Sequence, residues 1–197
     1  MRNMRDQFES LALALYEVRV PAALRNGLIV LGGTVFAAIC ANVALPLYFT
    51  PVPLTLAPFA VLLLGLVLSP RQAAATFAAY LAEGAMGLPV FAPGTPGIAH
   101  LFGPTGGYLF AYPLAAPLIA FLWRRSRRGF AIALLSAAAG DLVILACGSV
   151  WLATLTHASL SSVLTLAVLP FLPGDALKVA TAAAMAAGFQ RLHRKAA

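Results

Sequence analysis

The feature that most constrains the fold of this chain is a set of long apolar stretches without charged side chains. No Asp, Glu, Lys or Arg occurs in residues 26–70, 84–123 or 142–174. Only 10% of the 197 residues are charged and 61% are hydrophobic, with a mean hydropathy of +0.91. Because a soluble domain has roughly a quarter of its residues charged, this composition predicts an integral membrane protein.

The apolar stretches divide the chain into segments long enough to cross a membrane. A spanning helix needs about 20 residues, so 197 residues hold about six of them with short connections. The sequence therefore predicts an all-α integral membrane protein, a six-transmembrane-helix bundle with one membrane domain over residues 1–197. The predicted spans are about 24–45, 54–68, 72–86, 106–123, 130–155 and 171–189.

Residues 1–20 precede the first predicted span. Met4, Phe8, Leu11 and Leu15 recur at helical spacing, which is typical of a short amphipathic helix on the membrane surface. A solvated cytoplasmic tail is the other interpretation.

The positive charges predict the orientation of the chain. The net charge is +7, and all but one of the 13 Lys and Arg residues lie at the chain ends or in the segments around Arg71 and Arg124–Arg128. The positive-inside rule places this side in the cytoplasm, so we expect a multi-pass protein of the bacterial cytoplasmic membrane with both termini cytoplasmic. The aromatic interleaving of a nucleic-acid groove is missing, and we expect no nucleic-acid partner.

A Gly- and Pro-rich connection lies within the apolar stretch Tyr80–Phe110. Connections of soluble proteins are usually polar and face water. Apolar irregular backbone is tolerated at membrane depth where it packs on protein or lines a cavity. We interpret residues 87–105 as an external cap over a ligand cavity.

Four ionisable residues lie inside predicted spans, where each is expensive unless it is paired or solvated: Glu83, Asp141, Asp175 and Lys178. Asp175 and Lys178 lie three positions apart near the start of the last helix, so they can face one cavity. Lys178 and the helix N-terminus together can bind an anion. The alternative is a structural pair that neutralises itself.

The other two carboxylates allow several interpretations. Each can accept hydrogen bonds from a ligand, or stay protonated and bond to a neighbouring helix. For Glu83, next to the cap, a ligand contact is favoured. For Asp141, a structural or supporting role is favoured.

Sequence motifs of catalysis and of cofactor binding are missing. There is no GxxxxGK[ST] loop for ATP, and His100, His157 and His193 lack metal-ligand spacing. No His or Asp is arranged around a Ser or Cys as a nucleophile–base pair requires. We therefore expect no enzyme, no cofactor and no metal.

A stripe of small residues lies in the first predicted span, where Gly33, Ala37 and Ala41 follow one another at intervals of four. Such a stripe lets another helix approach closely. The approaching helix can belong to this chain or to a docking partner, and the pattern does not separate the two.

Five motifs along the chain resemble those of the BioY family, the biotin-specific S components of energy-coupling-factor (ECF) transporters. They are PVPLTL at Pro51–Leu56, YLAEGAMGLPVFA at Tyr80–Ala92, GPTGGYL at Gly103–Leu109, GDLVILACGSVWLA at Gly140–Ala153 and LPGDALK at Leu172–Lys178. GLPVFA, GPTGGYL and PGDxxK in this order are specific, whereas one alone is weak.

The resemblance implies a six-helix bundle capped by the loops between helices one and two and between helices three and four. It implies high-affinity capture of biotin from outside, completed by a transmembrane T protein and two ATPases. Lys178 would meet the biotin carboxylate, and Asp175 would accept ureido N–H groups or orient the lysine. The substrate-binding residues so predicted are Lys178, Asp175, Glu83, Tyr108, Phe91, Tyr80 and Asp141, and the stripe Gly33, Ala37 and Ala41 resembles the docking surface for the T protein.

The sequence departs from the family pattern at two positions. Ala57 stands where the family commonly has Gln, and Asp141 stands where Asn is expected. These departures leave open an S component for a different vitamin.

Two further functions come from other classes. One is an ion-coupled carrier of a small organic acid with Glu83 or Asp141 as the proton site, although the chain shows no internal inverted repeat. The other is a membrane-embedded enzyme acting on lipids, which the missing nucleophile disfavours.

Overall fold

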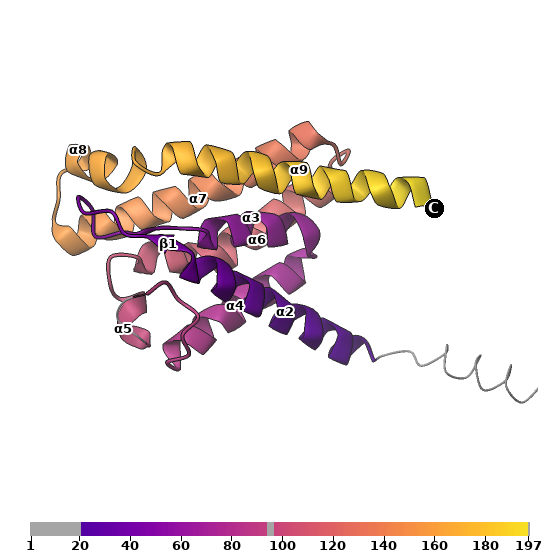
Figure 1. Ribbon diagram of the computed structural model, residues 1–197, viewed down its shortest axis with the longest axis horizontal. Helices are drawn as coiled ribbons and strands as arrows, with labels where there is room; N and C mark the ends of the chain where they lie inside the picture. Colours follow the sequence, from indigo (N-terminus) through magenta and orange to yellow (C-terminus); the bar gives the residue numbers. More distant parts are fainter. Residues whose placement is uncertain (1–20, 94–96, 197) are drawn as a thin grey trace, which may run out of the picture.

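The structure is a computed structural model that describes residues 21–93 and 97–196. The described residues form an all-helical bundle (Figure 1). Six helices have eleven residues or more: α2 (Ala22–Asn42), α3 (Ala57–Val67), α4 (Pro70–Ala85), α6 (Gly106–Arg125), α7 (Phe130–Thr156) and α9 (Leu172–Ala196). The predicted surface helix at residues 1–20 lies outside the described residues.

The six long helices correspond to the six predicted spans, but they differ in length. Helices α2, α6 and α7 are long and apolar enough to cross a membrane. A fourth span results if Ser161–Val168 and Leu172–Leu192, which meet at 47°, count as one. Helices α3 and α4 have only 11 and 16 residues, fewer than the roughly 20 that a lone span needs.

The short helix α3 lies inside the bundle rather than against lipid. It contacts α2, α4, α6, α7 and α9, and Ala60, Val61 and Leu62 are fully buried. A helix surrounded by protein has its ends covered by other elements, so it does not have to cover the full thickness of the hydrocarbon layer. Its N-terminus starts later than predicted because residues 54–55 pair as a strand.

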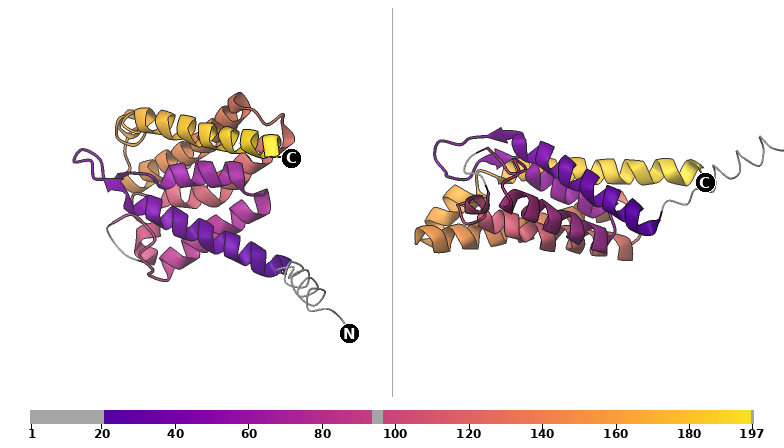
Figure 2. Two further views of the ribbon diagram at one scale, coloured as in Figure 1. Left: turned by 45° about the vertical axis from the view of Figure 1, so that its right-hand side comes forward. Right: turned by 90° about the horizontal axis from the view of Figure 1, so that it is seen from below.

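The packing order of the helices places the start of α2 and the end of α9 at the same end of the bundle. Helix α6 packs against α3, α4 and α7, while α9 packs against α3 and α7, and α2 against α3 and α4. Figures 1 and 2 show the start of α2 and the end of α9 at one end of the bundle. The α6–α7 connection with Arg127 lies between helices that reach this same end, and the loops that form the caps lie at the other.

The stripe of small residues on α2 packs inside the chain. Gly33, Ala37 and Ala41 are all buried, and a Cβ atom on Gly33 would lie 2.6 Å from Cγ2 of Thr76 on α4. A surface that docks a partner must be accessible. In this structure the stripe therefore makes an intramolecular contact, and its assignment to partner docking stays a prediction.

The opposite side of α2 is apolar and accessible. Leu24, Leu28, Leu31, Val35 and Ile39 are each more than half exposed, and they follow one another at intervals of three and four residues. A face of this kind is stable against lipid hydrocarbon, in agreement with an integral membrane protein.

Two loops form the caps at one end of the bundle. The first connects strands β1 (Ala44–Leu45) and β2 (Leu54–Thr55), which pair antiparallel. The second runs from Met86 to Thr105 and contains the short helix α5 (Ile98–Leu101). A third connection holds α8 (Leu160–Val163) and a π-helix, η1 (Leu164–Val168), before α9 begins.

Candidate functional site

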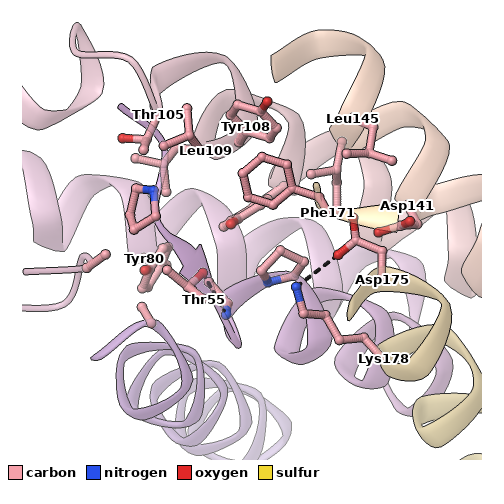
Figure 3. A pocket seen from close by; sticks show the side chains of 18 of the residues that line it. Thr55, Tyr80, Thr105, Tyr108, Leu109, Asp141, Leu145, Phe171, Asp175 and Lys178 are labelled. Atoms are coloured by element: carbon pink, nitrogen blue, oxygen red, sulfur yellow. Dashed lines mark hydrogen bonds and ion pairs between the residues drawn. The ribbon is translucent and has the colours of Figure 1, made fainter. Parts of the chain in front are cut away.

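A cavity lies among the helices of the bundle and beneath both caps (Figure 3). Most of its helical lining comes from α4, α6, α7 and α9, with Ala41 of α2 and Ala57 and Pro58 of α3 completing it, and each cap contributes residues. The first cap provides Val52, Pro53 and Thr55, and the second provides Ala92, His100 and Thr105. The predicted combination of a helical bundle and loop caps over a ligand cavity is thus present.

The buried pair at this cavity is Asp175 and Lys178. Lys178 Nζ donates a hydrogen bond to Asp175 Oδ1 at 2.9 Å, and the two side chains are only 8% and 6% exposed. Asp175 is in the first turn of α9, where its backbone N–H donates to Phe171 O at 2.8 Å. The pair is therefore both neutralised and directed to the cavity, as the sequence spacing predicted.

The ammonium of Lys178 has capacity beyond this ion pair. It carries three N–H donors, and within the described part of the chain only Asp175 is recorded as its acceptor. A buried charge that is removed from water gains from further hydrogen bonds. The free donor positions next to a cavity suit an anionic or carbonyl group of a ligand.

Asp141 adds a second carboxylate to the same cavity. Its residue is 8% exposed, and its Oδ1 is buried without a hydrogen-bond partner among the described residues. Figure 3 shows it on the same side of the cavity as Asp175. Because an unsatisfied buried oxygen is unfavourable, this atom is available to accept a hydrogen bond from a ligand.

Aromatic side chains form the apolar part of the wall. Tyr80, Tyr108, Tyr112 and Phe171 line the cavity. Two hydroxyls bond to backbone carbonyls: Tyr80 Oη donates to Val90 O at 2.9 Å, and Tyr108 Oη donates to Ala167 O at 3.0 Å. These bonds fix the rings of α4 and α6 to the second cap and to η1.

Two of the residues predicted to bind substrate lie elsewhere. Glu83 lines a separate groove between α2 and Leu88–Val90. Phe91 packs behind the wall, with its ring centroid 5.3 Å from that of Tyr80 and 5.2 Å from that of His100. The structure brings together the other five: Lys178, Asp175, Asp141, Tyr108 and Tyr80.

Several lining residues were not singled out from the sequence. Tyr112 lies one helical turn after Tyr108, and Ile144 and Leu145 lie one turn after Asp141. Helical periodicity from the predicted residues could have found these three. Ala57, at the start of α3, also lines the cavity, so one departure from the family pattern is located at the site itself.

The side chains present favour binding rather than metal chemistry. Among the described residues, no group of three His, Cys, Asp or Glu side chains could hold a metal ion. The site instead combines one ammonium and two carboxylates with an aromatic wall. It can hold a small molecule that has an apolar body, a negative end, and N–H donors.

Comparison with known proteins identifies the family of this chain. The model of the BioY family matches residues 11–195. The chain is 44% identical over 140 residues to the probable biotin transporter BioY of Pyrococcus horikoshii, covering 71% of this chain and 82% of that protein. It is 36% identical over 173 residues to the biotin transporter BioY of Thermotoga maritima, covering 88% and 95%.

A solved structure has the same fold. It is the crystal structure of the S-component for biotin from an ECF-type ABC transporter, with a TM-score of 0.79 and 25% sequence identity. The match covers 86% of this chain and 92% of that one.

Proposed function

Because this chain belongs to the BioY family, a family of transporters rather than of enzymes, we propose that it captures biotin with high affinity as the S component of an ECF-type importer. The observation that carries the proposal is the capped cavity with the buried Lys178–Asp175 pair and the unpartnered Asp141 oxygen. Support also comes from the relatives named as biotin transporters.

The chemistry of biotin matches the groups that line the cavity. Biotin has one carboxylate, a ureido ring with two N–H donors and a carbonyl, and an apolar bicyclic body. Lys178 binds the carboxylate through its remaining N–H donors, while Asp175 and Asp141 accept the ureido N–H groups. The rings of Tyr80 and Tyr108 enclose the bicycle. Glu83 and Phe91, which lie outside the lining, support the second cap.

Biotin enters from the outside in this proposal, and the chain ends are cytoplasmic. The exposed residues Arg71, at the start of α4, and Arg124–Arg128, at the end of α6 and in the connection that follows, lie at the bundle end with both described chain ends. The capped end has no Lys or Arg in its loops. The positive-inside rule then supports a cap that faces outward.

Transport requires partner chains. We propose a transmembrane T protein and two ATPases, which the resemblance to the ECF family implies; the structural neighbour is an S-component from an ECF-type ABC transporter. Uptake then stops when the ATPases are removed and continues when the proton gradient is collapsed.

One observation favours an ion-coupled carrier of a small organic acid as the second candidate. Asp141 is a buried carboxylate whose Oδ1 has no described partner, as expected of a proton site in a membrane. If the protein is such a carrier, the two uptake experiments give the reverse of the results expected for an ECF-type importer. Collapse of the proton gradient then stops uptake, whereas removal of the ATPases does not.

The ion pair is tested by equilibrium binding of radiolabelled biotin to purified protein in detergent. Lys178→Met alone leaves the Asp175 carboxylate buried and uncompensated, which can destabilise the fold. The double variant Lys178→Met/Asp175→Asn removes both charges at nearly constant volume. We expect it to fold and to bind biotin at least about a hundredfold more weakly, because charged hydrogen bonds contribute roughly 1.5–3 kcal/mol each.

The matched control is Arg191→Met, which removes one exposed positive charge from the same helix. It should bind biotin like the unmodified protein. Unchanged biotin binding by a folded double variant would show that the pair is structural only.

A further inference from the structure

A second hollow, lined by arginine side chains, lies at the end of the bundle where α2 begins and α9 ends. It is a groove between the ends of α3, α6 and α9, and Arg124, Arg127 and Arg128 lie along it. The capped cavity is formed by other residues, so this arginine groove is separate from the proposed biotin site.

The arginine groove carries positive charge that no described carboxylate balances. Within residues 21–93 and 97–196, the acidic side chains are Glu83, Asp141 and Asp175, and each lines another hollow. Arg124 is oriented by its own contact, since its Nε donates to Leu68 O at 3.2 Å. A guanidinium has five N–H donors, so most of the donors in the groove are available to an anion.

Part of the lining of the arginine groove is apolar. Trp123 forms a buried part of the lining, whereas Val67 and Phe189 are 47% and 57% exposed. Val67 is the last residue of α3, and Phe189 lies on α9, where Met185, one helical turn earlier, is also 51% exposed. An occupant of this groove therefore meets both guanidinium groups and exposed apolar side chains.

We propose that the arginine groove binds an anionic phospholipid, with the headgroup phosphate at Arg124, Arg127 and Arg128 and the acyl chains along Val67 and Phe189. Arginine binds phosphate through paired N–H donors, and basic pockets between membrane helices bind anionic headgroups. A free phosphate ion would use the arginines but would leave the exposed apolar side chains uncovered.

Neighbouring arginines provide matched controls. Arg125 does not line the groove, and its guanidinium carbon lies 5.2 Å from the ring centroid of Phe121. Arg71 is exposed at the start of α4 and is also outside the lining. The double variants Arg127→Gln/Arg128→Gln and Arg71→Gln/Arg125→Gln remove equal charge from one membrane side, but only the first changes the groove.

The experiment is native mass spectrometry of the detergent-purified full chain titrated with phosphatidylglycerol or with phosphatidylethanolamine of the same acyl chains. We expect the unmodified protein to retain phosphatidylglycerol in preference. The groove variant should lose about tenfold or more of this retention, because each Arg near an anionic headgroup contributes about 1 kcal/mol. The Arg71→Gln/Arg125→Gln variant should retain it.

Two outcomes would overturn the proposal. Equal losses in the two double variants would indicate general surface charge instead of a site. Displacement of the lipid by inorganic phosphate at equal concentration would indicate a phosphate-ion site without acyl contacts. Biotin binding measured on the same samples checks that each variant is folded.

Discussion

At the scale of single residues, the positions of the ionisable side chains decide what the cavity can bind. Lys178 and Asp175 form a direct ion pair at 2.9 Å, but Asp141 reaches the same cavity without a described partner for its Oδ1. An ion pair alone could be structural. The additional unpartnered acceptor favours a ligand with N–H donors.

Asp141 can be tested with two substitutions of similar size. Asp141→Asn keeps an acceptor oxygen, so biotin binding should stay within about tenfold of the unmodified protein. Asp141→Leu removes the acceptor and should weaken binding by about tenfold to a hundredfold, as expected for loss of a charged hydrogen bond. Both are measured by isothermal titration calorimetry with biotin.

The stability of the two Asp141 variants provides the control. Replacing a buried carboxylate whose Oδ1 lacks a partner among the described residues should leave the thermal unfolding temperature unchanged or raise it. Equal biotin affinities for the Asn and Leu variants would exclude Asp141 as a ligand contact.

Ala57 shows how one position affects the polarity of the site. It is 5% exposed and lines the cavity at the start of α3. The sequence marked this position because the family commonly has Gln there. The methyl group of Ala57 contributes no polar atom to the lining at this point.

At the scale of helices, the site depends on close contact between α6 and α7. A Cβ atom on Gly148 would overlap the ring of Tyr108, whose hydroxyl is bonded to Ala167 O at 3.0 Å. The absence of a side chain at residue 148 thus permits the position of a cavity-lining ring. Trp151, one turn later on α7, donates to Gly103 O at 2.9 Å and fixes the end of the second cap.

Gly148→Ala should therefore change both stability and binding. The added methyl group displaces the Tyr108 ring, and overpacking of this kind costs about 1–3 kcal/mol. We expect a lower unfolding temperature in detergent and weaker biotin binding. Thermal unfolding followed by circular dichroism, with and without biotin, measures both.

Gly188→Ala on α9 is the matched substitution, because nothing lies within 4 Å of a Cβ atom there. It should be neutral or slightly stabilising, since Ala favours a helix more than Gly does by about 1 kcal/mol. If Gly148→Ala behaves in the same way, the contact with Tyr108 does not restrict the helix pair.

At the scale of the whole molecule, the two ends of the bundle differ in chemistry. One end has two apolar caps over the proposed biotin site, and the other has the arginine groove and both described chain ends. Together with the positive-inside rule, this asymmetry supports the proposed orientation, in which the caps face outward and the arginine groove faces the cytoplasm.

Cysteine labelling tests the orientation. In a background with Cys40→Ala and Cys147→Ala, Tyr48→Cys introduces a thiol at a fully exposed position of the first cap. A membrane-impermeant maleimide should label it in intact cells. Ser126→Cys, exposed beside Arg127, should be labelled only after the membrane is permeabilised. The reverse pattern would place the caps in the cytoplasm.

Some of this protein followed from the sequence alone because the relevant physics is local. Charge-free apolar stretches predicted a helical membrane protein, since uncompensated charge is excluded from lipid. The spacing of Asp175 and Lys178 on one helix predicted their contact, because residues three apart share a helix face. The stripe of small residues likewise indicated a close helix contact, and the Gly- and Pro-rich segment indicated a loop.

The tertiary structure decided which polar residues share one cavity. Glu83 and Asp141 were similar in sequence, as single carboxylates in apolar helices, yet Asp141 lines the cavity and Glu83 lines a groove beside α2. Likewise, the sequence left open which helix approaches Gly33, Ala37 and Ala41, whereas the structure buries all three and places Thr76 of α4 against Gly33. Helical periodicity defines the faces of a helix, but the rotation of each helix in the bundle depends on all of its packing partners together.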